Sequence, residues 1–216
     1  MKKIRHGYLA AAFLVVAVIL LSDAEAGDIG GIVSRLQEKY GNISSIEADF
    51  TQEAYSRATK KAQTSEGKVY FKKPGKMRWQ YLKPVNDEIV SNGKTIWIYQ
   101  PDLGQVLERP FEGTASNLAT DFLSGVGNLK KNFDITLQSE TGAAYRLSLV
   151  PKEPQQNIRK VSIEADKSTF IIKKTVVEDN FGNETRVGLK NIKIDAPLKD
   201  SLFEFVPPKG AAVIKP

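Results

Sequence analysis

Large apolar and polar side chains alternate in the middle of this chain, and this alternation restricts its fold more than any other feature. From residue 77 to residue 81 the order is Met, Arg, Trp, Gln, Tyr. An extended backbone places successive side chains on opposite faces, so Met77, Trp79 and Tyr81 share one face and the polar residues face water. We therefore predict a half-buried strand with an unusually aromatic buried face.

Turn signals on both sides of this segment predict a meander. Asn92-Gly93 is typical of a type I′ turn, which would join strands at 88–90 and 95–99. A further turn at 101–104 leads into a strand at 105–108. The stretch 72–110 is thus predicted to form a curved antiparallel sheet that the rest of the chain extends or covers.

Strand patterns recur on both sides of this stretch. Ile46, Ala48 and Phe50 alternate with polar residues before it, and so do Val69 and Phe71 immediately ahead of the aromatic strand. Further strands separated by polar turns are expected at 133–138, 144–150, 158–165, 170–177, 184–193 and 202–206, with Pro207-Pro208 stopping further pairing. We predict a mainly β protein with short helices (α+β), built on one continuous antiparallel sheet that is curled or barrel-like.

Two helices are predicted. The first covers residues 28–40, where five apolar residues fall at helical spacing and Gly41-Asn42 follows as a stop. The second covers residues 115–125, with Leu118, Phe122 and Leu123 on one side. The residues alone favour packing of this short helix into the core, although its flanking glycines would also allow it to move as a lid.

Residues 1–26 have the pattern of a cleaved secretory signal. A basic start (Lys2, Lys3, Arg5) precedes an uncharged apolar run at 9–21, which is too short to span a bilayer, and Ala24-Glu25-Ala26 fits a cleavage site. A lipid anchor would need a cysteine at that site, and the chain has none. We expect an exported, soluble, periplasmic protein in which residues 27–216 form a single domain.

Most catalytic chemistry is disfavoured by composition. The chain has no cysteine, and its one histidine, His6, lies in the signal segment. A Ser-His-Asp triad, a cysteine nucleophile and the common zinc ligand sets therefore need residues that the mature chain lacks. Ser91 and Lys94 match the Ser-x-x-Lys pattern of acyl-enzymes, but the hairpin residues between them favour a turn. We expect no catalytic residue, no metal and no cofactor.

The basic stretch 57–83 raises the question of nucleic-acid binding. Its charges interleave with aromatic residues, as on a single-strand binding platform. The export signal argues against a nucleic-acid partner. So does the alternation, which places many of the basic side chains on the face opposite the aromatic rings. We interpret most of these charges as a solvated outer face that helps the protein approach anionic membrane surfaces or acidic partners.

The apolar face of the predicted sheet leaves two structures open. It could be an ordinary packed core, because an apolar sheet face must be buried against something. So many strands accompanied by so few helices could equally enclose an apolar cavity. The residues alone do not decide between the two.

Several segments resemble the periplasmic lipoprotein carrier family (LolA). They are KKPGKMRW at 72–79, VSNGKTIWIYQPDLGQV at 90–106, Phe50-Thr51-Gln52, and FEFVPPKG at 203–210. The order of these pieces along nearly the whole mature chain carries the resemblance. It implies an unclosed β-barrel with a helical lid, formed by 28–40 and 115–125, over an apolar cavity.

The resemblance also implies a function and a site. The expected function is a periplasmic chaperone that takes triacylated lipoproteins from an ATP-driven inner-membrane release complex (LolCDE-like) to an outer-membrane receptor (LolB-like), as a monomer. The lipid-binding residues would be Phe50, Val69, Met77, Trp79, Tyr81, Leu118, Phe122 and Leu123. Family members often carry an arginine, where this chain has Lys73, that holds the lid by bonding to backbone carbonyls; Arg78 is a second candidate for this role.

Two other functions fit parts of the pattern. The first uses the same fold, as an outer-membrane lipoprotein receptor or as a lipoprotein-sensing regulator of an envelope stress factor. The second is an enzyme that acts on lipid or glycan in the same compartment. Identification of a co-purifying lipid or lipoprotein would distinguish these alternatives.

Overall fold

The computed structural model describes residues 28–111, 128–155 and 157–215. Strands account for most of these residues: β1 Ser45–Ser56, β2 Lys61–Lys72, β3 Lys76–Lys83, β4 Glu88–Asn92, β5 Thr95–Gln100, β6 Gln105–Pro110, β7 Phe133–Glu140, β8 Ala144–Pro151, β9 Lys160–Asp166, β10 Ile172–Glu178, β11 Glu184–Ile194 and β12 Ala212–Ile214. The described helices are α1 Ile29–Asn42, α3 Leu129–Asn132 and the 3-10 helices η1 Pro101–Leu103 and η2 Asp200–Phe203.

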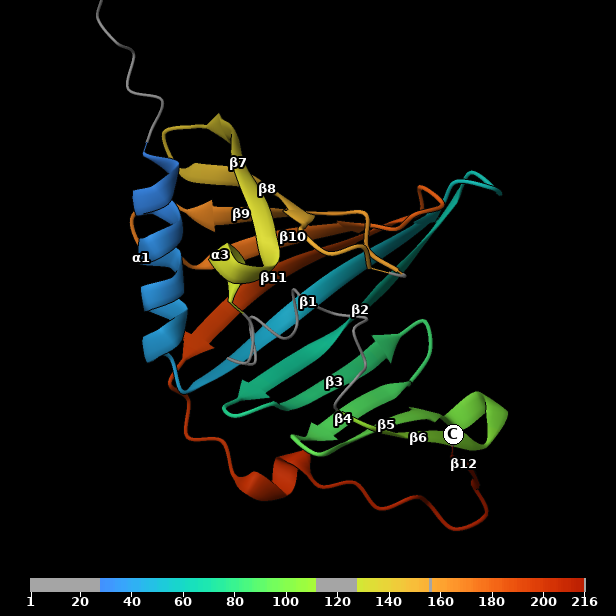
Figure 1. Ribbon diagram of the computed structural model, residues 1–216. Coiled ribbons are helices and arrows are strands. Elements are labelled where there is room, and N and C mark those ends of the chain that lie inside the picture. Colours follow the sequence, from blue (N-terminus) through green and yellow to red (C-terminus); the bar gives the residue numbers. More distant parts are fainter. Residues whose placement is uncertain (1–27, 112–127, 156, 216) are drawn as a thin grey trace, which may run out of the picture.

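All of these strands form one curved sheet (Figure 1), in the order β12-β6-β5-β4-β3-β2-β1-β11-β10-β9-β8-β7. Each neighbouring pair is antiparallel except β12 and β6. In the described residues the edge strands β7 and β12 do not pair with each other, so the sheet is an unclosed barrel. The predicted mainly β fold with one large, open, curved sheet is confirmed.

The inner face of the sheet carries the main core. The strand registers align its side chains across the sheet, so that Ile46, Phe71 and Met77 stand in one row and Ala48, Val69 and Trp79 in the next. Most of these side chains are buried. The core continues onto the inner faces of β8 and β9, where Leu147, Leu149, Val161 and Ile163 are almost completely buried. For β1, β2 and β3, alternation along the sequence therefore predicted the correct buried face.

Helix α1 closes one end of this core (Figure 1). Its buried residues are Ile32, Val33, Leu36 and Tyr40, which recur at the spacing predicted for an amphipathic helix. The helix begins one residue after the predicted start and continues to Asn42. The second predicted helix, 115–125, lies outside the described residues, and the short helix α3 had no counterpart among the predictions.

The Tyr40 hydroxyl links α1 to the start of strand β10. It accepts a hydrogen bond from the backbone N–H of Ile172 at 3.0 Å, inside the core. Burial raises the pKa of Tyr40 well above its usual value, and the bond from Ile172 opposes this shift only in part. The phenol therefore stays protonated in the folded chain at pH values where an unfolded chain ionises it, near pH 10.

This shift gives an alkaline stability prediction. Above about pH 10 the unfolded state binds fewer protons than the folded state, so the free energy of unfolding should fall as the pH rises. Tyr40→Phe should lower that free energy by about 1–3 kcal/mol at pH 8, since the buried N–H of Ile172 loses its acceptor, and should flatten the loss between pH 8 and pH 10.5. Urea unfolding at the two pH values measures both effects. An unchanged alkaline slope in the variant would contradict the assignment to Tyr40.

The predicted closing strand at 202–206 is wrong. Residues 200–203 form η2, the following residues are irregular, and the edge strand is β12, which pairs in parallel with β6. Phe203 is fully buried, and Phe205 packs between Trp97 and Tyr99, with ring centroids 6.1 Å and 5.9 Å away. We call residues 199–214 the C-terminal strap, because they lie across the outer face of β3–β6.

The hairpin between β4 and β5 is confirmed, but its predicted type I′ turn is wrong. Such a turn needs two central residues with positive φ, and here Gly93 has φ 89° while Asn92 is not in the left-handed region. The Asn92 side chain instead accepts hydrogen bonds from the N–H groups of Lys94 and Thr95, both at 2.9 Å. Ser91 pairs with Ile96, so Gly93 and Lys94 are the central residues of the turn. The Asn92 amide oxygen therefore stabilises the turn from the position before them, as Asn often does.

Candidate functional site

The site predicted from sequence lies on the inner face of β1–β3. Phe50, Val69 and Met77 are buried there, at 3%, 0% and 4% exposure. Trp79 and Tyr81 are half-buried and pack against the same core. The structure therefore brings together all five predicted residues that it describes. The other three, Leu118, Phe122 and Leu123, lie outside the described residues, and their role stays a prediction.

Aromatic rings interlock at the centre of this face. The ring of Phe50 meets Trp79 edge-on at 4.9 Å and Tyr81 at 5.1 Å, and Phe71 meets Trp79 at 5.9 Å. Such edge-to-face pairs hold aromatic side chains in fixed orientations. The half-buried rings of Trp79 and Tyr81 are therefore presented on a rigid base formed by Phe50 and Phe71.

Gly67 makes room for this arrangement. Tyr81 lies opposite Gly67 in the β2–β3 register and Phe50 lies opposite it in the β1–β2 register. A Cβ at this position would stand 2.8 Å from Cε1 of Phe50 and 1.9 Å from the carbonyl oxygen of Gln80. Only glycine lets the Phe50 ring and the neighbouring strand come so close.

The apolar inner face extends beyond the predicted residues. Half-buried apolar side chains pack against the core from several strands that supply no predicted site residue: Ile89 on β4, Ile135 and Leu137 on β7, and Val187 and Leu189 on β11. For Val187 and Leu189 the sequence contained a signal, because they alternate with Arg186 and Lys190 as on a strand with one buried face. Sequence reasoning missed them because it placed the binding residues only in the segments that became β1–β3 and in the helix predicted at 115–125.

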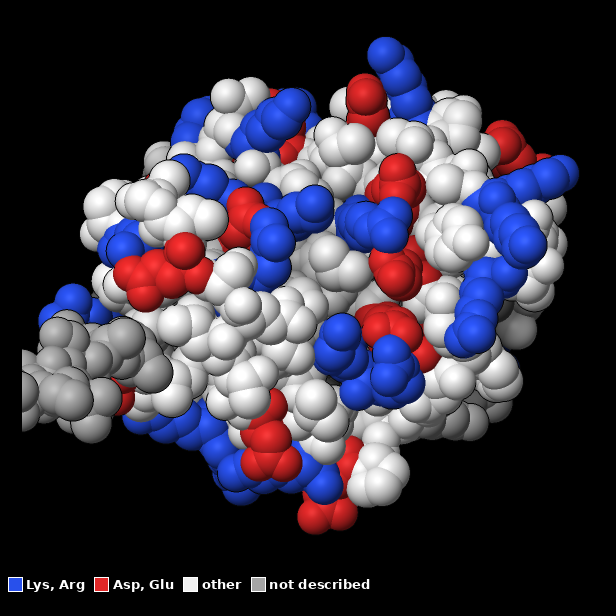
Figure 2. Space-filling model, turned by 90° about the horizontal axis from the view of Figure 1, so that it is seen from above, with Lys and Arg blue, Asp and Glu red and all other residues white. Residues whose placement is uncertain are grey.

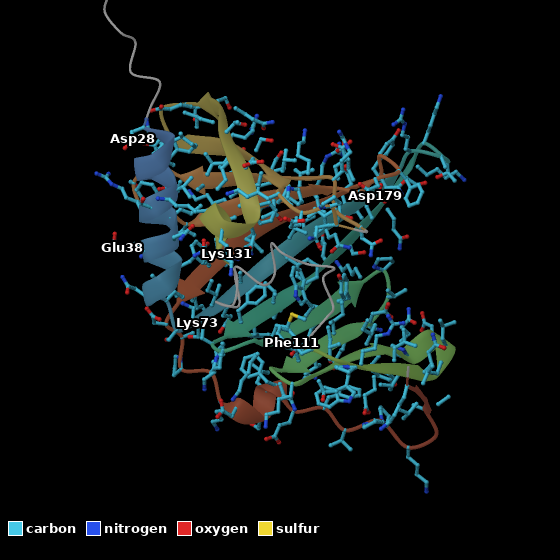
Figure 3. The ribbon with its side chains drawn as sticks, in the orientation of Figure 1. Asp28, Glu38, Lys73, Phe111, Lys131 and Asp179 are labelled. Atoms are coloured by element: carbon cyan, nitrogen blue, oxygen red, sulfur yellow. The ribbon has the colours of Figure 1, made fainter. Side chains whose placement is uncertain are left out.

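Phe111 is a further inner-face residue that sequence reasoning missed. It follows β6, and its backbone N–H donates to the carbonyl of Lys94 at 2.8 Å. Its ring lies against Gly75, where an added Cβ would come within 3.2 Å of ring atom Cε1. Phe111 packs against the core, and Figure 3 shows it beside β3 and β4 in the lower half of the sheet.

Two clefts differ in their chemistry. A cleft of about 260 Å³ lies between α1 and β7 and is lined mainly by apolar residues, among them Ile29, Val33 and Phe133. A cleft of about 330 Å³ crosses β7–β11 and is lined by charged side chains that include Arg146, Glu164 and Arg186. Only the first is suited to an apolar ligand, because burying charged groups against hydrocarbon is costly.

Lys73 connects the turn before β3 to the end of α1. Its Nζ donates to the carbonyl oxygen of Tyr40 and, at 2.9 Å, to that of Gly41. These carbonyls belong to the last turn of α1, where helix geometry leaves them without partners inside the helix. Partial burial lowers the pKa of the Lys73 ammonium, and the nearby Asp195 carboxylate opposes this shift. Figure 3 shows Lys73 at the lower end of α1.

Arg78 does not take part in this contact, and the prediction that it faces water is also incomplete. Its guanidinium is largely buried on the outer face, where it donates to the carbonyl of Leu202 at 3.0 Å and pairs with Glu88 at 2.6 Å. Arg78 therefore fastens the C-terminal strap rather than α1.

Ser91, which matches the Ser-x-x-Lys pattern with Lys94, takes part in a structural contact between two turns. The Ser91 hydroxyl is buried, donates to the carbonyl of Gly75 and accepts the N–H of Gly93, so it fixes two turns together. The described residues contain no group of three or more His, Cys, Asp or Glu side chains that could hold a metal ion. Among those same residues, no helix is long and apolar enough to cross a membrane.

Comparison with known proteins gives a consistent family. The family model described as outer membrane lipoprotein carrier protein LolA matches residues 41–206. An outer-membrane lipoprotein carrier protein of Methylococcus capsulatus is 35% identical over 184 residues, which cover 84% of this chain and 86% of that protein. One from Methylobacillus flagellatus is 29% identical over 209 residues, covering 96% and 98%.

A solved structure has a similar fold. The crystal structure of an uncharacterized conserved protein from Thermus thermophilus superposes with a TM-score of 0.57 at 17% identity, covering 87% of this chain and 98% of that one. At this identity the likeness concerns the fold alone.

Proposed function

This chain belongs to the LolA family of outer membrane lipoprotein carrier proteins, and from this premise we propose that its inner face shields the acyl chains of lipoproteins in transit. The observation that carries the proposal is the half-buried apolar surface of Trp79, Tyr81 and Leu189 above a fully buried core. A surface of this kind can bind hydrocarbon without giving up the packing that holds the sheet together.

The size of the hydrophobic effect explains why such a carrier is needed. Each buried methylene contributes roughly 0.8 kcal/mol, so one 16-carbon chain left in water costs on the order of 10 kcal/mol. A lipoprotein can cross an aqueous compartment only if its chains are covered throughout. The transfer requires no covalent step and no cofactor.

We place this transport in the periplasm, with residues 1–26 removed on export. The apolar run and the cleavage pattern at 24–26 support this location. The chain would act as a monomer, accept triacylated lipoproteins from an ATP-driven inner-membrane complex (LolCDE-like) and deliver them to an outer-membrane receptor (LolB-like). Delivery proceeds when the receptor covers the acyl chains better than the carrier does.

Recovery of the cargo tests this function. We expect the protein purified from the envelope fraction to co-elute with acylated lipoproteins, identified by mass spectrometry of the bound material. The purified protein should also keep an acylated lipoprotein in the supernatant, and should have no effect on the same protein lacking its acyl chains. Equal binding of the acylated and non-acylated forms would contradict the proposal.

We propose that Lys73 holds α1 against the sheet and so controls access to the inner face. The contacts that support this role are the two bonds from Nζ to the carbonyls of Tyr40 and Gly41. Lysine supplies these donors without the planar fork that arginine would offer. An arginine at this position also carries N–H donors and could make the same two contacts.

Lys73→Met should loosen α1. Loss of both hydrogen bonds from this partly exposed ammonium should cost about 1–2 kcal/mol, which corresponds to roughly 5- to 30-fold faster amide hydrogen exchange in 29–42. Lys73→Arg should keep exchange near the original rate. As a control, Lys68→Met removes an exposed pair with Asp49 and should leave α1 unchanged. Equal exchange in the Met and Arg variants would refute the role of Lys73.

A further inference from the structure

Two turns project together from the side of the sheet opposite α1. They are the β1–β2 turn at 57–60 and the β10–β11 turn at 179–183, which lie side by side at the right of Figure 1, where Figure 3 labels Asp179. The backbone N–H of Arg57 donates to the side chain of Asn183 at 3.0 Å, and this bond ties the two turns to each other. We call these two turns, with Lys61, the hairpin tip.

An aromatic ring stands exposed on the hairpin tip. Phe181 is 77% exposed and is the only aromatic residue among the large exposed apolar side chains of the described chain. Its backbone is held firmly, because the Asp179 carboxylate accepts the N–H groups of Phe181 and Asn183, both at 2.8 Å. A side-chain bond from Asn180 to the carbonyl of Gln155, at 2.9 Å, adds a third attachment. The ring is therefore presented to solvent by a fixed turn.

Three basic side chains lie on the same hairpin tip as this ring. Arg57, Lys60 and Lys61 are exposed, and no described carboxylate forms an ion pair with any of them. The Arg57 side chain lies across Gly182, where an added Cβ would come within 2.8 Å of its Cδ and Nη1 atoms. The Arg57 side chain thus packs against the residue that follows Phe181 in the same turn. Figure 2 shows Lys and Arg side chains gathered at the right edge of the molecule, the side from which the tip projects in Figure 1.

We propose that the hairpin tip docks on a membrane surface rich in anionic phospholipid, with Phe181 entering the interface and the three basic residues contacting lipid phosphates. An aromatic ring beside several basic groups is the chemistry that recognises such a surface. The shape of the tip favours lipid over a protein partner: a projecting turn with one apolar side chain offers no groove or broad apolar patch for a folded surface. This inference stands apart from the proposed carrier function, since it concerns the hairpin tip and not the inner face of the sheet.

A fluorescent label at the tip tests the docking. The chain has no cysteine, so Phe181→Cys gives one labelling site for an environment-sensitive dye on the purified exported protein, residues 27–216. Vesicles of phosphatidylglycerol and phosphatidylcholine in equal parts should shift the emission to the blue, and pure phosphatidylcholine should not. The shift should vanish in 1 M salt, where screening shortens the Debye length to about 3 Å. The same label at Leu103, which is 66% exposed elsewhere, should not respond.

Charge reversal on the unlabelled chain provides a second measurement. Lys60→Glu with Lys61→Glu should reduce the vesicle-bound fraction in sedimentation at least about fivefold, because the attraction to anionic lipid depends on the basic residues at the surface. Lys94→Glu with Lys209→Glu changes the net charge equally on other exposed loops and should leave binding nearly unchanged.

Three results would overturn the proposal. One is an equal response of the labels at positions 181 and 103, and another is equal loss of binding in the two charge-reversed variants. The third is a tip label that ignores anionic vesicles but responds to an acidic envelope protein, which would assign the tip to a protein partner.

Discussion

Trp79→Glu should abolish most lipoprotein binding while the protein still folds. Trp79 is half-buried on the inner face, so the new carboxylate keeps access to water in the empty protein. When acyl chains cover the face, that carboxylate must lose its water without gaining a partner, which is costly. We expect affinity for an acylated lipoprotein to fall at least tenfold, equivalent to about 1.4 kcal/mol or more.

Leu82→Glu is the matched control for this change. Leu82 lies on the same strand, β3, and is 55% exposed, so the same negative charge there should leave binding unchanged. Binding is measured as the lipoprotein kept in the supernatant, with the melting temperature recorded on the same preparation. A Trp79→Glu protein that binds normally would remove Trp79 from the site, and one that unfolds would place Trp79 in the core.

Phe71→Ala, unlike Trp79→Glu, should act mainly on the stability of the fold. Phe71 is 1% exposed and its ring packs edge-on against Trp79, so the substitution leaves a cavity in the core. The free energy of unfolding should fall by about 3–5 kcal/mol. For a domain of this size that corresponds to a melting temperature lower by about 6–20 °C.

Phe181→Ala is the control for the loss of a phenyl ring. Phe181 is 77% exposed, and a surface substitution of this kind usually changes stability by less than about 0.5 kcal/mol. Thermal melts of the two variants give the comparison. Equal, small losses would mean that the inner face around Phe71 is not packed as described.

Much of the fold was predictable because polar turn residues separate segments of strand length. The predicted segments 133–138 and 144–150 correspond to β7 and β8, and 184–193 corresponds to β11. The start of β10 was predicted two residues early, at 170. Phe170 has φ 57°, a left-handed conformation that apolar residues rarely adopt and that composition does not reveal.

The C-terminal strap shows where alternation fails. Phe203-Glu204-Phe205-Val206 has the period of a strand, but any extended segment with one buried side has the same period. Here residues 203–206 belong to the C-terminal strap and not to a strand, and Phe203 is buried against the outer face of the sheet. No local sequence pattern distinguishes a strap from a strand, because the difference depends on the strands that lie beneath the segment.

The site was predictable only in part, for a similar reason. The resemblance to the carrier family indicated the residues of β1–β3, and the structure gathers them on one face. The partner of Lys73 is 33 positions away in sequence, and no local pattern encodes a contact of that range. Arg78 was predicted from its alternation with Met77 and Trp79 to face water, but the strap covers it.

Photo-crosslinking at two neighbouring positions tests the central claim most directly. Leu189 packs against the core on the inner face, and Lys190 is exposed on the outer face of the same strand. A photoreactive amino acid at position 189 should cross-link to the acyl chains of a bound lipoprotein, and the same group at position 190 should not. Cross-linking to the acyl chains from position 190 and not from 189 would show that the cargo lies elsewhere and would contradict the account.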